Sequence, residues 1–566
     1  MSTTRARSST QPAPPSTDRR RLPAREVWWD ALWPLGLYAL ISLLLFGLPI
    51  LDDPTGEIVA ADEIDSSVFM WFYGWWLHAL LHGLNPFVTY HQFVPEGFNL
   101  QWSTSMPLPS LLLSPVTLAL GPSVAWNLIQ LASPALSAWT AFLLCRHVTG
   151  RPSASLVGGY VFGFSPYMLA HLTGGPYLAL VPLVPIFVLL VLRRLEGRMS
   201  PRRFVLAMTV ALTAQYLISI EVLATSTLFG AVALVAAFVL LSEHRRALIG
   251  VTKLLIAAYA ATAILVSPFL YYFFFGDQYP PGATYFRADL ASFALPPHML
   301  AVTRSHSPDD VFRGAVLEAY LGLPLIALIL VFAWQQRRRR STWLLLICLV
   351  VPAIGMLGEK LIVRSELTDI PMPWSLLQRL PVLEHAIPVR FALFVTLAAA
   401  LIVALWLVRG SLGRWALALL VVASFLPNVG NAVWQTEISN PAFFETGEYR
   451  DRLEAEDHVL TIPVWGPNER WQADTKFDFR LSAGYLGNPF PPSYSRYPIW
   501  DTFLTGRLTP SYATQLRRFV RDKEVTAIVV DKRQPGPWSR LFGSLGVRPV
   551  DTGGVLFYRL RAPRES

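Results

Sequence analysis

The sequence predicts a polytopic α-helical membrane protein with about 11 transmembrane helices, followed by a small α/β domain. Three observations lead to this class: the composition, the lengths of the apolar runs, and the positions of the basic residues. Of the 566 residues, 53% are hydrophobic and 15% are charged, and the mean hydropathy is +0.41. A soluble domain could not bury that much apolar surface, so we expect most of the chain to lie in a bilayer.

The spans are predicted from apolar runs close to the length that crosses about 30 Å of hydrocarbon. We expect a disordered basic cytoplasmic tail at 1–28, a transmembrane domain at 29–433 and an extracytoplasmic α/β domain at 434–566. The expected spans are 31–50, 122–145, 154–172, 177–192, 204–220, 222–241, 248–270, 316–334, 343–357, 389–408 and 415–433. The first run lacks a small-residue cleavage site after it, which favours a retained span over a signal peptide.

Basic residues set the expected orientation, because cytoplasmic loops are enriched in Lys and Arg. With the amino terminus inside, every even-numbered span should end at a basic residue, and five do: Arg146, Arg193, Arg245, Arg337 and Arg409. The carboxyl terminus is then outside, in a multi-pass protein of the cell membrane. The formal charge of +9 comes largely from such short clusters, so nucleic acid is not an expected partner.

The first external loop, 51–122, lies within a stretch of about 120 residues from Arg25 to Arg146 that contains no Lys or Arg. Its run at 107–121 contains three prolines, and counting it as a span would place the later basic clusters outside. We therefore expect an interfacial or re-entrant helix there. The stretch 68–82, which carries Trp71, Trp75 and Trp76, predicts an amphipathic helix in the membrane interface.

The polar tail at 434–566 contains three strand-like apolar runs, at 458–463, 525–530 and 555–560, and a basic helical stretch at 512–523. This alternation predicts the α/β domain. Walker, Rossmann and zinc-ligand spacings are absent from the sequence, and the two cysteines lie inside apolar runs. We expect no cofactor, no metal and no disulfide framework.

Acidic residues just beyond the first span are the candidate catalytic groups. Asp62, Glu63 and Asp65 can hold a carboxylate at the membrane surface, where it could deprotonate a hydroxyl. Asp65 is preferred because the expected aromatic helix begins close to it and would place a region of low dielectric constant beside the carboxylate. A solvated acidic loop is the structural alternative for each of the three. Asp52 and Asp53 fit a turn at the exit of the span.

The same loop offers candidate sugar-binding residues, Asn85, His91 and Trp102, because a sugar ring stacks on aromatic faces and hydrogen-bonds to amides. Shaping of the loop explains its Asn-Pro and Pro-Glu-Gly turns equally well. His78 and His82 lie four residues apart, but without a further ligand they make a weak metal signal.

Arg390 begins a span on the expected outer side, against the charge bias, and therefore needs a partner. A lipid phosphate would provide one through a bidentate contact. An ion pair with Glu221 or Glu384 is the structural alternative. Arg287 and Arg304 are further candidate phosphate ligands. Glu221, at the turn between two spans, is a further candidate for substrate binding.

Several short motifs resemble the GT-C superfamily of membrane glycosyltransferases, in particular uncharacterised bacterial members. They are the segments 65–71, 75–80, Asn85-Pro86-Phe87, 95–100 and Pro388-Val389-Arg390-Phe391. The resemblance implies a GT-C-like fold and inverting transfer of a sugar from a polyprenyl-phosphate donor. The acceptor would be a glycan, lipid or protein of the cell envelope. Asp65 would take the acceptor proton and Arg390 would stabilise the phosphate. Trp28-Trp29-Asp30 departs from the oligosaccharyltransferase signature, since it lies on the cytoplasmic side.

Two other functions remain open from the sequence: a multi-span transporter or lipid-linked-sugar flippase, and a non-catalytic assembly protein. Transporters usually carry polar groups near the bilayer midplane and often contain inverted repeats, and neither is visible in this sequence. An enzyme predicts that Asp65 and Arg390 share one outward cavity that opens towards lipid.

Overall fold

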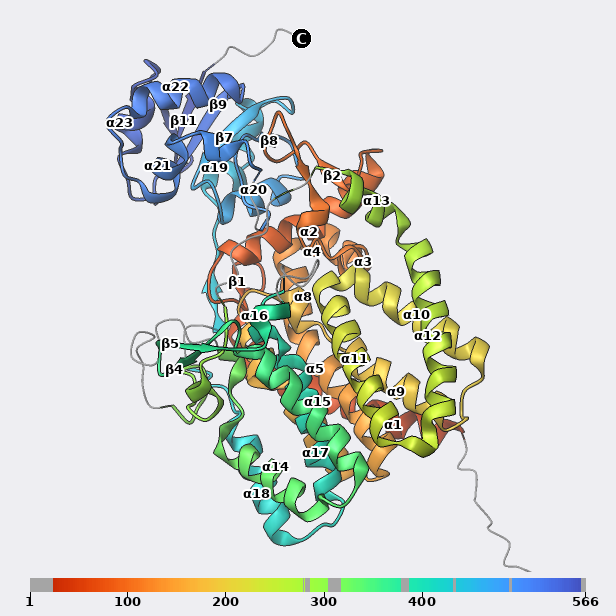
Figure 1. The fold of residues 1–566 in the computed structure, drawn as a ribbon. Helices are drawn as coiled ribbons and strands as arrows, with labels where there is room; N and C mark the ends of the chain where they lie inside the picture. Colours follow the sequence, from red (N-terminus) through yellow and green to blue (C-terminus); the bar gives the residue numbers. More distant parts are fainter. Residues whose placement is uncertain are drawn as a thin grey trace, which may run out of the picture.

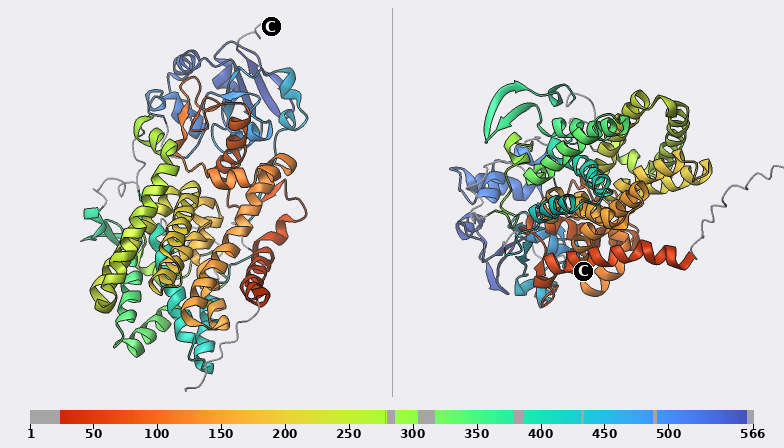
Figure 2. Two further views of the ribbon diagram at one scale, coloured as in Figure 1. Left: turned by 90° about the vertical axis from the view of Figure 1, so that its right-hand side faces the viewer. Right: turned by 90° about the horizontal axis from the view of Figure 1, so that it is seen from below.

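The computed structural model describes residues 24–277, 279, 286–303, 317–377, 386–430, 434–487 and 491–560. Long helices form a bundle, and a unit containing a β-sheet covers one end of it (Figure 1). Turned views show the same two layers, with the sheet unit stacked on the bundle (Figure 2).

The bundle is built around one deeply buried helix, α17 (Ala392–Leu407), in which almost every residue is buried. It packs against α5, α6 and α15. A β-carbon at Gly158 of α6 would lie only 3.0 Å from the carbonyl oxygen of Ala400, so the two backbones pass very close together. The bundle helices are α1 (Ala24–Ser42), α5 (Pro122–Thr149), α6 (Pro152–Gly163), α7 (Pro166–Leu172), α8 (Pro176–Ala179), α9 (Leu183–Leu195), α10 (Pro201–Ile218), α11 (Ile220–Leu240), α12 (Arg245–Leu265), α13 (Ser267–Phe275), α14 (Gly322–Gln336), α15 (Arg340–Met356), α17 and α18 (Leu412–Ser424).

Six helical stretches within the described residues are long and apolar enough to cross a membrane: Ala31–Ile50, Pro122–Thr149, Pro176–Leu195, Ile220–Leu240, Ser242–Leu265 and Pro388–Leu407. Helices α14, α15 and α18 are apolar but shorter. The chain is therefore a helical membrane protein, and the larger count of about 11 spans stays a prediction.

Proline divides one of the expected spans. The run 154–172 forms two helices, because Pro166 lacks an amide hydrogen and begins α7. The hydroxyl of Ser165 caps the new helix by accepting a hydrogen bond from the Met168 amide at 3.3 Å. The last expected span, 415–433, is shorter than predicted, since α18 ends at Ser424.

Basic helix ends gather at one end of the bundle. Arg340 donates to the Ser242 hydroxyl at 3.2 Å, Arg414 donates to Gln335 at 2.8 Å, and His147 lies 3.1 Å from Glu196. Glu221 lies at the opposite end of α11 from Arg245. This distribution agrees with the expected charge asymmetry, while the side of the membrane on which it lies stays a prediction.

The proline-rich run of the first loop is not a single span. It forms two short helices, α3 (Pro107–Leu112) and α4 (Ser114–Leu120), separated at Leu113. The small strands β2 (Val88–Thr89) and β3 (Phe98–Asn99) precede them. Further short pairs join β1 (Glu57–Ile58) to β6 (Thr436–Glu437), and β4 (Lys360–Val363) to β5 (Glu366–Pro371).

Helix α2 (Ile64–Leu81) corrects the expectation of an amphipathic interfacial helix. Its residues from Ser66 to Tyr73 are all buried, as are Trp75 and Trp76. The middle of the helix is therefore enclosed by protein, whereas Ile64, Leu80 and Leu81 at its ends are exposed. The helix lies between the bundle and the sheet unit (Figure 1).

The C-terminal unit holds a five-stranded sheet in the order β10-β11-β9-β7-β8. The three runs expected to be strands are strands: β7 (His458–Ile462), β9 (Ala527–Asp531) and β11 (Val555–Arg559). β7 is parallel to β8 (Arg480–Leu481) and to β9, while β11 is antiparallel to β9 and to β10 (Val550–Thr552). The unit's helices are α19 (Ala442–Glu445), α20 (Pro467–Asp474), α21 (Ile499–Thr505), α22 (Tyr512–Asp522) and α23 (Trp538–Gly543).

A buried amide joins α2 to this unit. The Oε1 atom of Gln472, on α20, accepts hydrogen bonds from Trp71 Nε1 at 2.6 Å and from Gln92 Nε2 at 3.1 Å. Its Nε2 atom donates to the carbonyls of His91 at 2.8 Å and Phe479 at 2.7 Å. One side chain thus satisfies polar groups from α2, the first loop and the C-terminal unit.

We predict that Gln472→Leu destabilises the protein by about 2–4 kcal/mol, because the buried indole and amide groups would lose their partner. The apparent melting temperature of the detergent-solubilised chain should fall by several degrees. Gln515→Leu on the more exposed helix α22 is the matched control and should change it little. Equal melting temperatures for Gln472→Leu and wild type would contradict the role of this junction.

Candidate functional site

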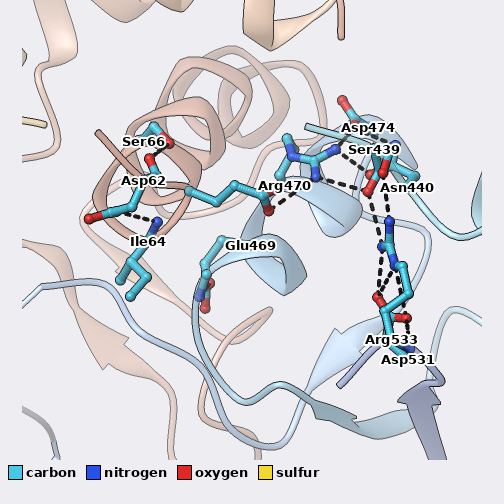
Figure 3. Close-up of polar contacts among 12 residues, drawn as sticks. Asp62, Ile64, Ser66, Ser439, Asn440, Glu469, Arg470, Asp474, Asp531 and Arg533 are labelled. Atoms are coloured by element: carbon cyan, nitrogen blue, oxygen red, sulfur yellow. Dashed lines mark hydrogen bonds and ion pairs between the residues drawn. The ribbon is translucent and has the colours of Figure 1, made fainter. Parts of the chain in front are cut away.

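The acidic residues singled out in the sequence lie at the start of α2: Asp62 and Glu63 precede the helix, and Asp65 is in its first turn. The Asp62 carboxylate accepts a hydrogen bond from the Ile64 amide at 2.8 Å, and the Ser66 hydroxyl donates to the Asp62 carbonyl at 3.0 Å (Figure 3). Asp62 thereby shapes the start of the helix. Asp65 follows within that turn.

Asp65 reaches solvent, yet surrounding protein raises its pKa to about 6. Burial by neighbouring atoms is the largest cause, and the Asp62 carboxylate adds to it. The positive charge of Arg390 and a hydrogen bond from Tyr485 act in the opposite direction. Gly174, in the α7–α8 connection, approaches closely, since a β-carbon there would lie 3.5 Å from the Asp65 carboxylate. An accessible but partly desolvated carboxylate fits a general base.

Arg390 lies in the short helix η9 (Pro388–Phe391) that leads into α17. Its guanidinium forms an ion pair with Glu221 at the start of α11 and lies over the ring of Tyr177, with its carbon 5.7 Å from the ring centre. The structure therefore contains the Arg390–Glu221 ion pair, which the sequence offered as the alternative to phosphate binding by Arg390. The other possible partner, Glu384, lies outside the described residues.

A second polar pair, His171 and Glu318, lies beside the first, and the sequence analysis missed it. The imidazole Nε2 is 3.5 Å from the Glu318 carboxylate, and both side chains are more than 90% buried. Burial raises the pKa of Glu318 to about 7, with Arg390 opposing and Glu221 supporting the shift. Sequence spacing gave no signal for this pair, because the two residues are distant along the chain and meet through the packing of α7 on η7 (Leu317–Ala319).

These groups form one electrostatic neighbourhood. Tyr177 interacts with Arg390, Glu221 and Asp65, and Asp65 itself interacts with Arg390. The structure thus brings Asp65, Arg390 and Glu221 together, although they are far apart in the sequence. They lie at the end of the bundle that faces the C-terminal unit.

Glu63 contacts a different set of charges, which belongs to the C-terminal unit. Its carboxylate is 3.5 Å from the buried guanidinium of Arg470. Arg470 also contacts Asn440, the Ser439 carbonyl and Asp474, while Arg533 joins Asp531 to Ser439 (Figure 3). Burial raises the pKa of Glu63, and Arg470 opposes that shift. Its contacts favour a role in the junction of α2 with the C-terminal unit.

The three candidate sugar-binding residues make contacts that shape the first loop. Asn85 donates to the Tyr272 hydroxyl at 2.8 Å, and Trp102 donates to the Asp277 carbonyl at 2.9 Å. His91 packs on Trp75, and burial lowers its pKa to about 4. These contacts match the loop-shaping alternative, and sugar binding by these residues stays a prediction.

The remaining candidate cations are not seen in the neighbourhood of Asp65. Arg287 packs against Gly358, since a β-carbon added at Gly358 would lie 2.8 Å from the β-carbon of Arg287. The Nε atom of Arg287 is buried and has no hydrogen-bond partner among the described residues. Arg304 lies outside the described residues. No group of three or more potential metal ligands occurs in the described part of the chain.

A cavity of about 340 Å³ opens between Glu63 and Ile64, at the start of α2, and the carboxyl ends of β7 and β9; neither Asp65 nor Arg390 lines it. Its lining residues are Glu63, Ile64, Pro463, Trp465, Pro467, Asp531, Arg533 and Gln534. Of these residues only Glu63 was a candidate from the sequence, because the others meet it only when the C-terminal unit docks on α2.

Comparison with solved structures shows the fold. The chain resembles the oligosaccharyltransferase AglB from the archaeon Archaeoglobus fulgidus, solved with an inhibitory peptide and a dolichol-phosphate, with a TM-score of 0.52 and 13% identity over 96% of this chain and 76% of that one. It also resembles the arabinofuranosyltransferase AftD from Mycobacteria, with a TM-score of 0.61 and 15% identity over 94% of this chain and 40% of that one. The expected GT-C fold is confirmed.

No curated protein matches the sequence. A family model described as "Domain of unknown function (DUF6311)" matches residues 35–426, which include the bundle, the first loop and both Asp65 and Arg390. The chain therefore belongs to the DUF6311 family.

Proposed function

We propose that this protein is a membrane glycosyltransferase that moves a sugar from a polyprenyl-phosphate donor to an extracytoplasmic acceptor, with inversion. The observation that carries the proposal is the accessible Asp65 carboxylate, with its raised pKa, in the electrostatic field of Arg390. The fold supports it, since AglB and AftD are glycosyltransferases by name and AglB was solved with a dolichol-phosphate.

In this mechanism Asp65 removes the proton from the acceptor hydroxyl as its oxygen attacks the anomeric carbon of the donor sugar. The bond from that carbon to the phosphate oxygen breaks, and its electron pair leaves with the phosphate. The proton ends on the Asp65 carboxylate. A pKa of about 6 keeps this carboxylate ionised at neutral pH while making it a stronger base than an ordinary aspartate.

Arg390 binds the phosphate in the proposed complex. The ion pair with Glu221 uses one of its terminal nitrogens, Nη1, and a guanidinium has five N–H donors. The remaining donors can meet phosphate oxygens while Glu221 holds the side chain in place. Glu221 is thus a positioning residue for Arg390.

The position of the charges favours an enzyme over a transporter. Glu221 lies in the first turn of α11, Arg390 precedes α17, and His171 lies in the last turn of α7. All three are at or next to helix ends. A transport site would be expected near the middle of the bundle.

We predict that Asp65→Asn lowers sugar transfer by about 10²–10⁴-fold, because the acceptor proton would lose its base. The measurement is transfer from a labelled polyprenyl-phosphate sugar by membranes containing the variant. Asp52→Asn, an exposed aspartate of the same loop, is the matched control and should retain full activity. Retained transfer by Asp65→Asn would remove this residue from the base role.

The pH dependence should follow the ionisation of Asp65. Since the base is active when deprotonated, and its pKa is raised to about 6, the rate should be constant above that pH and fall about tenfold per pH unit below it. Tyr485→Phe removes a hydrogen bond that lowers this pKa, so the midpoint should move to higher pH. A midpoint near 4, or one unmoved in Tyr485→Phe, would contradict the assignment.

Arg390→Ala should raise the KM for the lipid-linked donor by about tenfold or more, because a charged hydrogen bond to the phosphate is lost. Glu221→Gln retains the guanidinium and separates this role from that of the ion pair. Glu221→Gln should weaken donor binding less than Arg390→Ala does, although both variants break the Arg390–Glu221 ion pair. If the folded Arg390→Ala protein bound donor as tightly as wild type, the ion pair alone would explain this arginine.

A further inference from the structure

The cavity between the start of α2 and the C-terminal unit has the chemistry of a saccharide site. The indole of Trp465 lines it, together with the polar residues Glu63, Asp531, Arg533 and Gln534. Sugars are recognised by this combination of an aromatic ring with planar hydrogen-bonding side chains. At about 340 Å³ the cavity is at the small end of ligand sites, which suits a short saccharide.

The polar wall of the cavity is fixed before any ligand binds. The Arg533 guanidinium contacts the Asp531 carboxylate at 2.7 and 3.1 Å and donates to the Ser439 hydroxyl at 2.6 Å. The Asp531 side chain is 2% exposed, whereas that of Arg533 is 52% exposed. A buried anion therefore holds an accessible cation in one orientation, which lowers the entropy lost when a ligand binds.

A second buried carboxylate, Glu469, connects the aromatic wall to Asp65. It accepts hydrogen bonds from the Gly466 amide at 3.0 Å and the Tyr485 amide at 2.7 Å. Trp465 precedes Gly466 and packs edge-on against the Tyr485 ring at 5.5 Å. Tyr485 in turn hydrogen-bonds to Asp65. One contact chain therefore runs from the cavity to the proposed base.

The position of the cavity distinguishes acceptor from donor. It is formed by the C-terminal unit and by Glu63 and Ile64 before Asp65, whereas Arg390 belongs to the bundle. Ile64, which lines the cavity, immediately precedes Asp65. A group in the cavity could thus present a hydroxyl to Asp65 while the donor phosphate lies at Arg390.

We propose that this cavity binds the saccharide end of the acceptor, so that the acceptor is a glycan. The inference rests on the proposed function, since it assigns the acceptor of that reaction. Trp465 stacks on a sugar ring, and Glu63, Arg533 and Gln534 bind its hydroxyls. An extended peptide or a lipid tail would need a longer or more apolar groove than these residues form.

The test is saturation-transfer NMR on the full-length protein in nanodiscs, with a panel of short hexopyranose and pentofuranose oligosaccharides as probes. At least one should bind wild type, and Trp465→Leu and Gln534→Ala should weaken that binding about tenfold, as expected for loss of one stacking or hydrogen-bonding group. Trp465→Phe should restore part of it. Lys532→Ala, beside the cavity and paired with Asp551, is the matched control and should bind as wild type.

Three results would overturn the proposal: no probe binds, binding is equal in wild type and both variants, or short peptides bind in a Trp465-dependent manner instead. Gln534→Ala keeps the test informative if Trp465→Leu fails to fold. The Asp65→Asn protein separates the two proposals. Saccharide binding that depends on Trp465, together with undiminished transfer by Asp65→Asn, would contradict only the assigned base. Loss of transfer without such binding would contradict only the glycan site.

Discussion

The docking of α2 between the bundle and the C-terminal unit is the constraint on which the rest of the structure depends. Its tryptophans are enclosed, and one of them donates to the buried amide of Gln472. Because Asp65 lies in the first turn of this helix, the same packing fixes its position relative to the bundle, which carries Arg390, and to the C-terminal unit, which forms most of the cavity. Loss of the C-terminal unit would expose the helix and leave one wall of the site missing.

Charge at this junction is divided between two neighbourhoods with different properties. Around Arg390 one cation lies among Glu221, Glu318 and Asp65, so acidic groups outnumber basic ones there. Around Arg533 and Arg470, charges are paired and hydrogen-bonded to the backbone. The first arrangement raises pKa values and suits chemistry, whereas the second gives a rigid polar wall.

The sequence predicted most of what depends on local pattern. Apolar runs located the helices, the proline-rich run of the first loop was correctly excluded as a span, and the three strand-like runs form strands. Asp65 and Arg390 were singled out because a carboxylate or a cation beside the membrane needs a partner. The burial of α2 was predicted wrongly, since its tryptophans suggested a membrane interface when their partners were residues such as Phe477 and Gln472, about 400 positions later. The His171–Glu318 pair and the cavity were invisible for the same reason, because both are made by tertiary contacts.

The most direct test of the central claim is a structure of the protein with a non-hydrolysable polyprenyl-phosphate sugar. The account predicts the phosphate within hydrogen-bonding distance of Arg390, and the anomeric carbon between that phosphate and a hydroxyl held by Asp65. A donor bound with its phosphate remote from Arg390, or with its sugar on the opposite side of the bundle from Asp65, would contradict it.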